Sequence, residues 1–324
     1  MIVVTGIAGF IGMHTAKRLL DAGEQVIGID SLNSYYDPAL KQARLQHLRD
    51  AHPRLIFIQH DLAEPHGIEK ILAPHAANIT AFIHLAAQAG VRYSLEAPRS
   101  YISANINAQM EVLEWCRAHP TCKHLVYASS SSVYGNASDQ PFRPSQNTDH
   151  PISLYAATKK SVEVLTDSYA HLYRIAATGL RFFTVYGPWG RPDMAYFKFT
   201  KAILAGQPIA VYNHGDMRRD FTYIDDIVDG ILGVLKAPPS GPRPHNIYNL
   251  GNHRSEQLMD MIRHLETQLR TAAITDMQPM QPGDVRETYA DIADATRDFG
   301  YHPKTKLEDG LKPFVEWYRS YYGV

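Results

Sequence analysis

The sequence lacks most features of secreted, metal-rich or membrane-inserted proteins. Its 324 residues include only two cysteines, Cys116 and Cys122, with no disulfide or metal framework around them, which fits a reducing compartment. No apolar run approaches membrane-spanning length, and a predicted strand that begins at residue 2 leaves no room for a signal peptide. An excess of one charge is also missing, because 32 Lys and Arg face 33 Asp and Glu, so neither nucleic acid nor an anionic membrane is expected as a partner. These absences predict a soluble, cytoplasmic protein.

A glycine-rich turn follows the first apolar run. The segment TGIAGFIG at residues 5–12 lies between that run and an amphipathic run through Leu20, which is the order strand, turn, helix. Its glycines let backbone amides approach a pyrophosphate at a helix N-terminus, where the helix dipole favours an anion. The next strand ends at Asp30, where a carboxylate meets the adenosine ribose and repels a 2′-phosphate. The segment therefore predicts NAD as cofactor, with a tight turn that holds no ligand as the alternative.

Strand and helix patterns alternate up to about residue 182. This alternation predicts an α/β fold with a doubly wound parallel sheet covered on both faces. Strands are expected at 2–4, 25–29, 55–58, 81–85, 124–128 and 176–180, and helices at 38–51, 97–119 and 154–173. Beyond residue 182 prolines are frequent and the helices are shorter. We therefore predict an NAD-binding Rossmann domain over residues 1–182 and a smaller α/β UDP-sugar-binding domain over 183–324, with part of about 220–250 returning to the first.

Tyr155 and Lys159 are the strongest candidates for acid–base chemistry. Four residues apart on a predicted helix, the two side chains share one face. A free tyrosine titrates near pH ~10, and a nearby ammonium favours its phenolate, so the pair can pass protons at neutral pH. The same spacing occurs on solvated helix faces, but the glycine-rich turn upstream favours the functional interpretation.

In order and spacing, these motifs together resemble extended short-chain dehydrogenases/reductases that act on nucleotide sugars. The resemblance covers nearly the whole chain and includes residues 5–12, 61–62, 84–87, 129–135, 155–159, 186–188 and 219–221. Residues 84–94 and 153–160 look most like UDP-glucuronate 4-epimerases. The loop at 30–37 is similar to theirs as well, with Ser31 where asparagine is expected. Asp30 and Asn33 remain, so this departure does not disturb the NAD prediction.

The resemblance implies a role for each matching position. Tyr155 is the base, Lys159 supports it, and the Ser130 hydroxyl bonds the 4-oxygen of the sugar. Cofactor contacts are expected from Gly6, Gly9, Phe10, Ile11, Gly12, Asp30, Asn33, Asp61, Leu62, Ala86, Gln88, Tyr155, Lys159 and Tyr186. Substrate contacts are expected from Ser130, Ser131, Ser132, Thr184, Arg191, Arg219 and Asp284. For Arg191, Arg286 and Arg92 an ordinary surface ion pair is equally open, although related enzymes have a basic residue that reaches phosphate at the position of Arg286. His14, His60 and His84 are expected to be packing or surface residues and not metal ligands.

Ser131 and Ser132 distinguish the reactions within the family. By resemblance, 4,6-dehydratases have Asp-Glu at these positions, and UDP-glucuronate decarboxylases have Glu at the position of Ser132. Serines supply no carboxylate for elimination. With Thr184 they could donate to the substrate carboxylate and hold it out of alignment with the 4-keto π system, which suppresses loss of carbon dioxide. We therefore predict reversible NAD-dependent epimerisation of UDP-glucuronate to UDP-galacturonate through a 4-keto intermediate.

Three alternatives remain at this level. A 4-epimerase of neutral UDP-hexoses and a UDP-glucuronate decarboxylase belong to the same family, whereas an inactive NAD-binding regulatory protein belongs to another class. The intact Tyr155, Lys159 and Ser130 argue against an inactive protein, because cofactor sensing requires none of them. The predicted helices at 97–119 and 154–173 commonly form a dimer bundle in similar proteins, so a homodimer is expected.

Overall fold

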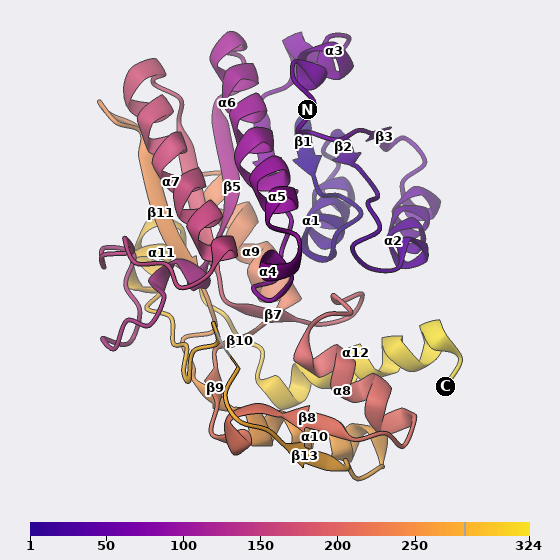
Figure 1. Cartoon of the computed structure of the whole chain (residues 1–324). Helices are drawn as coiled ribbons and strands as arrows, with labels where there is room; N and C mark the ends of the chain where they lie inside the picture. The colour runs from indigo at the N-terminus through magenta and orange to yellow at the C-terminus, as the bar shows by residue number, and fades with distance from the viewer. Residues whose placement is uncertain (282) are drawn as a thin grey trace.

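A computed structural model describes residues 1–281 and 283–324 of the chain. Its centre is a seven-stranded sheet in the order β11-β6-β5-β4-β1-β2-β3, with all neighbouring strands parallel. The strands are β1 (Ile2–Thr5), β2 (Val26–Asp30), β3 (Ile56–Gln59), β4 (Ala81–His84), β5 (His124–Ser130), β6 (Ala177–Phe182) and β11 (His245–Leu250). Helices cover both faces of this sheet (Figure 1). The predicted doubly wound α/β fold is confirmed.

Two hydrophobic cores lie on opposite faces of the sheet, because successive side chains of a strand point to opposite sides. Val4 and Ile83 belong to the first core, together with residues of α1 (Phe10–Asp21), α2 (Pro38–Ala51) and α9 (Ile224–Leu235). Val3 and Phe82, one residue earlier in the same strands, belong to the second core with α3 (Gly67–Leu72), α6 (Ala108–Ala118) and α7 (Leu154–Tyr173). The strands are therefore buried on both sides, as parallel sheets require.

A third core lies at the carboxyl ends of the strands, in the lower half of Figure 1. Its helices are α8 (Ala195–Leu204), α10 (Leu258–Leu269) and α12 (Leu307–Tyr322), with α11 (Ala293–Phe299) packed nearer the sheet against α9 and β11. Three two-strand pairs accompany them: β7 (Thr184–Tyr186) with β10 (Phe221–Tyr223), β8 (Ile209–Val211) with β13 (Thr275–Met277), and β9 (Arg218–Arg219) with β12 (Glu256–Gln257). Between them the chain returns to the sheet through α9 and β11. The domain boundary after residue 182 stays a prediction.

The predicted helix at 97–119 is not continuous. The chain instead forms α4 (Tyr93–Glu96), α5 (Pro98–Tyr101), a π-helical turn η2 (Ile102–Asn107) and then α6. The π turn buries Asn105, whose side chain accepts from the Gln88 amide at 2.7 Å and donates to the Thr158 hydroxyl at 2.9 Å. These bonds join the loop after β4 to α7. Such π turns occur often beside functional sites.

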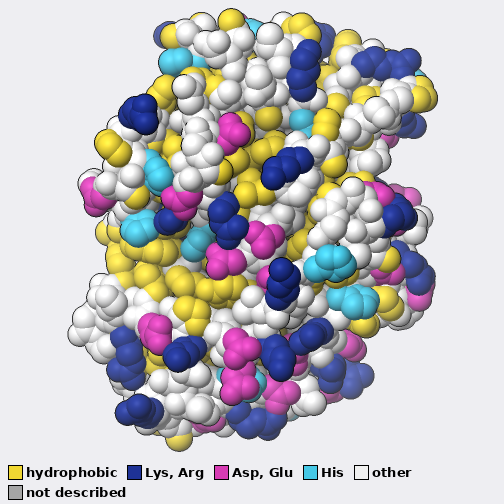
Figure 2. Space-filling view, turned by 180° about the vertical axis from the view of Figure 1, so that it is seen from behind, with side chains coloured by type: hydrophobic (Ala, Val, Ile, Leu, Met, Phe, Trp, Pro, Cys, Tyr) yellow, Lys and Arg dark blue, Asp and Glu magenta, His cyan; other side chains and the backbone are white. Residues whose placement is uncertain are grey.

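Charged side chains of both signs share the surface. Figure 2 shows positive and negative side chains interspersed over the face seen from behind. No helix among the described residues is long and apolar enough to cross a bilayer. Within residues 1–281 and 283–324, no three His, Cys, Asp or Glu side chains gather as metal ligands do. Cys116 is buried, Cys122 is partly buried, and both are free thiols.

Candidate active site

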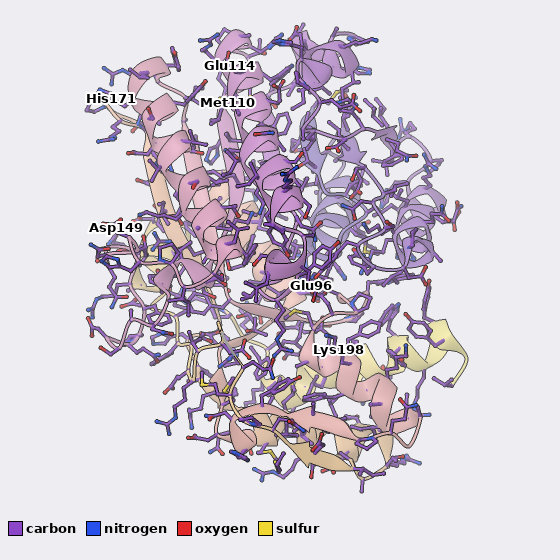
Figure 3. The ribbon with its side chains drawn as sticks, in the orientation of Figure 1. Glu96, Met110, Glu114, Asp149, His171 and Lys198 are labelled. Atoms are coloured by element: carbon purple, nitrogen blue, oxygen red, sulfur yellow. The ribbon has the colours of Figure 1, made fainter. Side chains whose placement is uncertain are left out.

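A cavity of about 770 Å³ lies at the carboxyl ends of the parallel strands. Residues of the sheet region and of the C-terminal region both line it. Glu96 of α4 and Lys198 of α8 are among them, and Figure 3 places the two on either side of the space between these regions. The carboxyl end of the strands is where doubly wound sheets bind their ligands.

Nearly all predicted site residues reach this one cavity. From the predicted cofactor set, the lining includes Gly6, Gly9, Phe10, Ile11, Gly12, Asp30, Asn33, Asp61, Leu62, Ala86, Gln88, Tyr155 and Lys159. From the predicted substrate set, it includes Ser130, Ser131, Ser132, Thr184, Arg191, Arg219 and Asp284. The fold thus gathers residues from the whole chain, while their individual roles remain predictions.

Tyr186 is the exception. Its ring is fully buried in the third core between Tyr196, Phe221 and Tyr223, and its hydroxyl donates to the Lys306 carbonyl at 3.1 Å. The Tyr186 side chain therefore packs in the third core and does not line the cavity, and its predicted contact to the cofactor stays a prediction. The preceding strand ends at Phe182, which does line the cavity.

The glycine-rich turn has no room for side chains. A Cβ on Gly12 would lie 2.0 Å from the Gly6 carbonyl oxygen, and one on Gly9 would lie 2.9 Å from it. Helix α1 has no acidic residue in its first turn, and its N-cap residue Gly9 has no side chain to bond the first amides. These amides therefore stay open to an anion. This cradle fits the pyrophosphate of the predicted dinucleotide.

Asp30 and Asn33 line the same cavity. Asp30 accepts hydrogen bonds from the amides of Ala8 at 3.0 Å and Leu32 at 2.9 Å. Burial raises its pKa, and the Leu32 bond and the Lys41 charge oppose that shift. Lys41, which sequence reasoning missed, donates to the Asn33 side chain at 2.7 Å and also lines the cavity. Lys41 belongs to no recognised motif, because it lies on α2, the helix that follows the loop at 30–37.

Helix α7 presents Tyr155 and Lys159 one turn apart. The helix starts after Ser153, whose hydroxyl accepts from the Ala156 amide at 3.1 Å and so caps the first turn. The Lys159 ammonium donates to the Ala128 carbonyl at 2.9 Å, which ties the helix to the end of β5.

Burial acts on both ionisable groups of this pair. It lowers the pKa of Lys159 to about 8. It raises the pKa of Tyr155, while the Ser130 hydroxyl and the charge of Arg191 lower it. Arg191 is thus a second cation near the Tyr155 phenol, and the predicted support by Lys159 stays a prediction.

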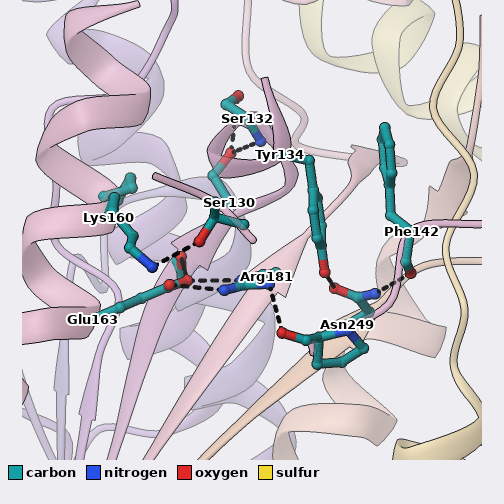
Figure 4. Close-up of polar contacts among 12 residues, drawn as sticks. Ser130, Ser132, Tyr134, Phe142, Lys160, Glu163, Arg181 and Asn249 are labelled. Carbon is teal, nitrogen blue, oxygen red and sulfur yellow. Dashed lines mark hydrogen bonds and ion pairs between the residues drawn. The ribbon is translucent and has the colours of Figure 1, made fainter. Parts of the chain in front are cut away.

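The three predicted serines lie at the end of β5. The Ser130 hydroxyl accepts from the Ser132 amide at 3.2 Å and donates to the Ser132 hydroxyl at 3.1 Å, as the chain enters the 3₁₀ turn η3 (Ser131–Tyr134). Figure 4 shows these contacts above a buried ion pair, in which Arg181 Nε lies 2.8 Å from Glu163 Oε1. The Ser129 hydroxyl donates to the same carboxylate at 2.6 Å. Strand end and helix α7 are thus fixed to each other.

Arg191 enters the cavity already paired. Its Nε donates to Asp193 Oδ1 at 3.0 Å, and the Tyr35 hydroxyl donates to Asp193 Oδ2 at 3.1 Å. Burial alone would raise the pKa of Asp193, but the charge and hydrogen bonds of Arg191 outweigh it and hold that pKa below its ordinary value. Sequence reasoning missed Asp193, although an Arg-x-Asp spacing beside a predicted site residue was a usable signal.

The remaining predicted cations separate into two groups. Arg219 lines the cavity, and its Nη1 donates to the carbonyls of Arg218 and Arg286 at 2.9 Å and 3.1 Å. Arg92 lines it too and pairs with Asp284 at 3.1 Å. Arg286 does not line the cavity. Its exposed guanidinium pairs with Asp216 at 3.0 Å.

The predicted non-ligand histidines lie in separate places. His84 contacts the Thr5 hydroxyl at 2.8 Å, and burial lowers its pKa to about 3. His14 contacts the Pro188 carbonyl at 3.0 Å. His60 lines the cavity at its adenosine-side end.

Comparison with known proteins places this site in a family. Residues 2–251 match the NAD dependent epimerase/dehydratase family. Protein CapI of Staphylococcus aureus is 48% identical over 335 residues, with 99% of both chains covered. UDP-glucuronate 4-epimerase 1 of Arabidopsis thaliana is 48% identical over 336 residues, which cover 99% of this chain and 77% of the plant protein.

A solved structure agrees over the full length. The UDP-glucuronic acid 4-epimerase from Bacillus cereus, in complex with UDP-glucuronic acid and NAD, matches with a TM-score of 0.90 at 33% identity, and 99% of each chain is covered. The resemblance seen in the motifs is thereby confirmed: the chain belongs to the NAD dependent epimerase/dehydratase family.

Proposed function

We propose that this protein catalyses the reversible epimerisation of UDP-glucuronate to UDP-galacturonate at C4, with NAD as a cofactor that stays bound. The relatives named above support the reaction class and the substrate. The observation that carries the choice of reaction is the end of β5, where Ser131 and Ser132 line the cavity beside Tyr155 and Arg191. Hydroxyls and a guanidinium suit a carboxylate that must be held, and positions 131 and 132 carry no acid to drive elimination.

Proton movement at the 4-oxygen falls to Tyr155 and Ser130. Tyr155, as the phenolate, takes the proton of the 4-hydroxyl, and Ser130 donates a hydrogen bond to the same oxygen. Bound NAD would supply the hydride acceptor and donor for C4. Lys159 holds the first turns of α7 against the Ala128 carbonyl, which keeps the phenol in place. Between the two hydride transfers the 4-keto sugar turns to present its other face, and Tyr155 then returns the proton.

The carboxylate at C5 has to survive this sequence. A 4-keto uronate is a β-keto acid, and it loses carbon dioxide when the C5–C6 bond aligns with the carbonyl π system. Ser131, Ser132 and Thr184 donate hydrogen bonds to the carboxylate and keep it out of that alignment, with Arg191 as the nearby cation. A glutamate at position 132 would repel the carboxylate, so decarboxylation is disfavoured.

The two ends of the cavity hold the nucleotides. Arg219 binds the diphosphate of the UDP-sugar, and burial, which lowers its pKa, makes an anionic partner favourable. Asp284 binds the uridine ribose. Asp30 and Asn33 would hold the adenosine ribose of NAD, and the glycine-rich turn would hold its pyrophosphate.

A homodimer through α6 and α7 completes the proposal. These helices lie side by side on one face of the sheet, and Figure 3 shows Met110 and Glu114 on α6 and His171 near the end of α7. Val164 and Leu172 of α7 are 55% and 62% exposed. Exposed apolar side chains on such a face are what a second copy would cover.

The test is product analysis with purified protein and UDP-glucuronate, without added NAD. We expect UDP-galacturonate to form until an equilibrium mixture is reached, because epimerisation consumes no net redox equivalents and the protein retains its cofactor. Accumulation of UDP-pentose would identify a decarboxylase instead. A stoichiometric requirement for NAD with release of NADH would identify a net oxidation and contradict the proposal.

A further inference from the structure

Asp193 stands out among the cavity residues because it is a carboxylate where an anionic substrate group is expected. It pairs with Arg191 through Nε at 3.0 Å and Nη2 at 2.5 Å, so two of the three guanidinium nitrogens are engaged. Among the described residues, the Nη1 group has no hydrogen-bond partner. The pair therefore leaves the Nη1 amino group of a largely neutralised cation without a partner among the described residues.

A tyrosine from a different loop completes the arrangement. The Tyr35 hydroxyl donates to Asp193 Oδ2 at 3.1 Å, and its ring packs against Tyr93 with centroids 4.8 Å apart. A Cβ on Gly90 would lie 2.6 Å from that hydroxyl, so the loop after β4 leaves room for Tyr35 only with glycine there. Asp193 is therefore held from the cofactor side of the cavity.

The backbone just before Arg191 is held by hydrogen bonds that do not involve Asp193. Arg44 of α2 is fully buried and donates to the Trp189 carbonyl at 2.6 Å, the Gly190 carbonyl at 3.0 Å and the Ala8 carbonyl at 3.0 Å. It thereby joins the glycine-rich turn to the residues just before Arg191. A change at Asp193 should thus alter the charge beside Arg191 without releasing the loop.

We propose that Asp193 is a positioning and specificity residue for uronate substrates: it orients the Arg191 guanidinium and offsets its charge, so that a substrate carboxylate binds loosely enough to turn during the reaction. This inference rests on the proposed function. A 4-keto sugar must show both of its faces to one bound cofactor, so its carboxylate must exchange partners in every turnover. A fully charged guanidinium in a buried site would hold the carboxylate strongly in one orientation.

The decisive variant is Asp193→Asn, which keeps an oxygen that accepts from Arg191 but removes the negative charge. Dissociation constants for UDP-glucuronate and UDP-glucose are measured by calorimetry on the NAD-bound enzyme, and kcat and KM are measured with UDP-glucuronate. We expect UDP-glucuronate to bind roughly tenfold more tightly, as one stronger charged contact would allow, with kcat lower by a similar factor. The affinity for UDP-glucose, which has no carboxylate, should stay within about twofold.

Tyr35→Phe should change the affinity for UDP-glucuronate in the opposite direction, and it keeps the inference testable if Asp193→Asn fails to fold. Without the tyrosine donor, Asp193 pairs more fully with Arg191, so the uronate alone should bind about twofold to threefold more weakly. Asp298 offers a matched control, because it accepts from Arg297 at 2.6 Å and from the Tyr248 hydroxyl at 2.8 Å outside the cavity. Asp298→Asn should change neither ligand's affinity.

Several outcomes would overturn the inference. Equal changes for UDP-glucuronate and UDP-glucose would show that Asp193 acts only on the loop. Weaker uronate binding in Asp193→Asn would show that Asp193 orients Arg191 without offsetting its charge. The ratio of the two dissociation constants needs no turnover, so a wild-type protein that makes no UDP-galacturonate would be recognised separately as a failure of the proposed function.

Discussion

At the scale of single residues, the proposed reaction depends on the phenol of Tyr155. Tyr155→Phe should leave NAD and UDP-glucuronate binding intact and lower kcat by about 10²–10⁴, the usual contribution of a general acid–base group. Single-turnover measurements of NADH formation by absorbance check this directly. Tyr318→Phe, a buried tyrosine of α12 away from the cavity, is the matched control. Near-normal turnover in the Tyr155 variant at neutral pH would mean that another residue is the base.

Ser132 tests the recognition of the carboxylate. Ser132→Ala should lower kcat/KM for UDP-glucuronate by about one to two decades, since a lost hydrogen bond to a charged group costs about 1.5–3 kcal/mol. The freed carboxylate can also turn into alignment with the 4-ketone, so the fraction of UDP-pentose should rise. Chromatography of the products measures both effects. An equal loss of affinity for UDP-glucose would remove carboxylate recognition from Ser132.

At the scale of elements, a buried ion pair joins α7 to β6 behind the serines. Glu163 and Arg181 are each 2% exposed and lie 2.8 Å apart (Figure 4). Glu163→Gln should lower the free energy of unfolding by about 3–5 kcal/mol, because it leaves the Arg181 charge buried without a partner. The double variant Glu163→Leu, Arg181→Met removes both charges, and its free energy of unfolding should fall much less. Urea unfolding of both variants measures these changes, and equal losses of unfolding free energy would contradict the ion-pair explanation.

Asp220 joins three segments beneath the cavity. It accepts from the amides of Asn252 at 2.6 Å and Ala290 at 3.1 Å and from the Thr222 hydroxyl at 3.0 Å. Burial raises its pKa from the ordinary 3.8 to about 6, although these hydrogen bonds lower it. The folded state therefore takes up a proton at higher pH than the unfolded state does, so this group's stabilisation is fully present below pH 3.8 and is lost as the pH rises through 6.

The stability difference between wild type and Asp220→Asn should consequently depend on pH. We expect wild type to be the more stable at pH 7 by about 1–3 kcal/mol, because asparagine cannot accept all three bonds. That advantage should grow by about 1–2 kcal/mol at pH 4.5. Urea unfolding at the two pH values measures it, and an advantage that shrinks at low pH would show that Asp220 stays ionised in the folded protein.

The elements also show which parts of the structure follow from local sequence. The helices α2 and α7 have the predicted bounds, 38–51 and 154–173. The predicted helix at 97–119 fails at the π turn, because the bonds of Asn105 to Gln88 and Thr158 are tertiary. Motif spacing brings most predicted site residues to one cavity. It does not predict that the Tyr186 side chain packs in the third core or that Arg44 is buried, since burial depends on packing that no local pattern records.

At the scale of the whole molecule, the cavity draws its walls from both halves of the chain. The sheet region supplies the glycine-rich turn, the serines and α7, while Arg191, Arg219 and Asp284 come from residues beyond 182. Arg44 ties these halves together, because one guanidinium bonds carbonyls of both. In the proposed reaction, a uronate sugar between the two sets of residues turns while Arg219 and Asp284 hold its nucleotide. Separate sites for nucleotide and sugar thus make epimerisation compatible with retention of the substrate.

The oligomeric state is the last property that belongs to this scale. Val164 and Leu172 are exposed on α7, the helix that also carries Tyr155, so a dimer would bury them and brace the catalytic helix. Changing both to lysine places charges in the contact, and light scattering should report a monomer of about half the wild-type mass, with the circular dichroism spectrum unchanged. Ile274, 55% exposed between α10 and β13, is the matched control, and Ile274→Lys should leave the mass unchanged. A wild-type protein that is already monomeric, or a double variant that remains dimeric, would show that this face does not join two copies.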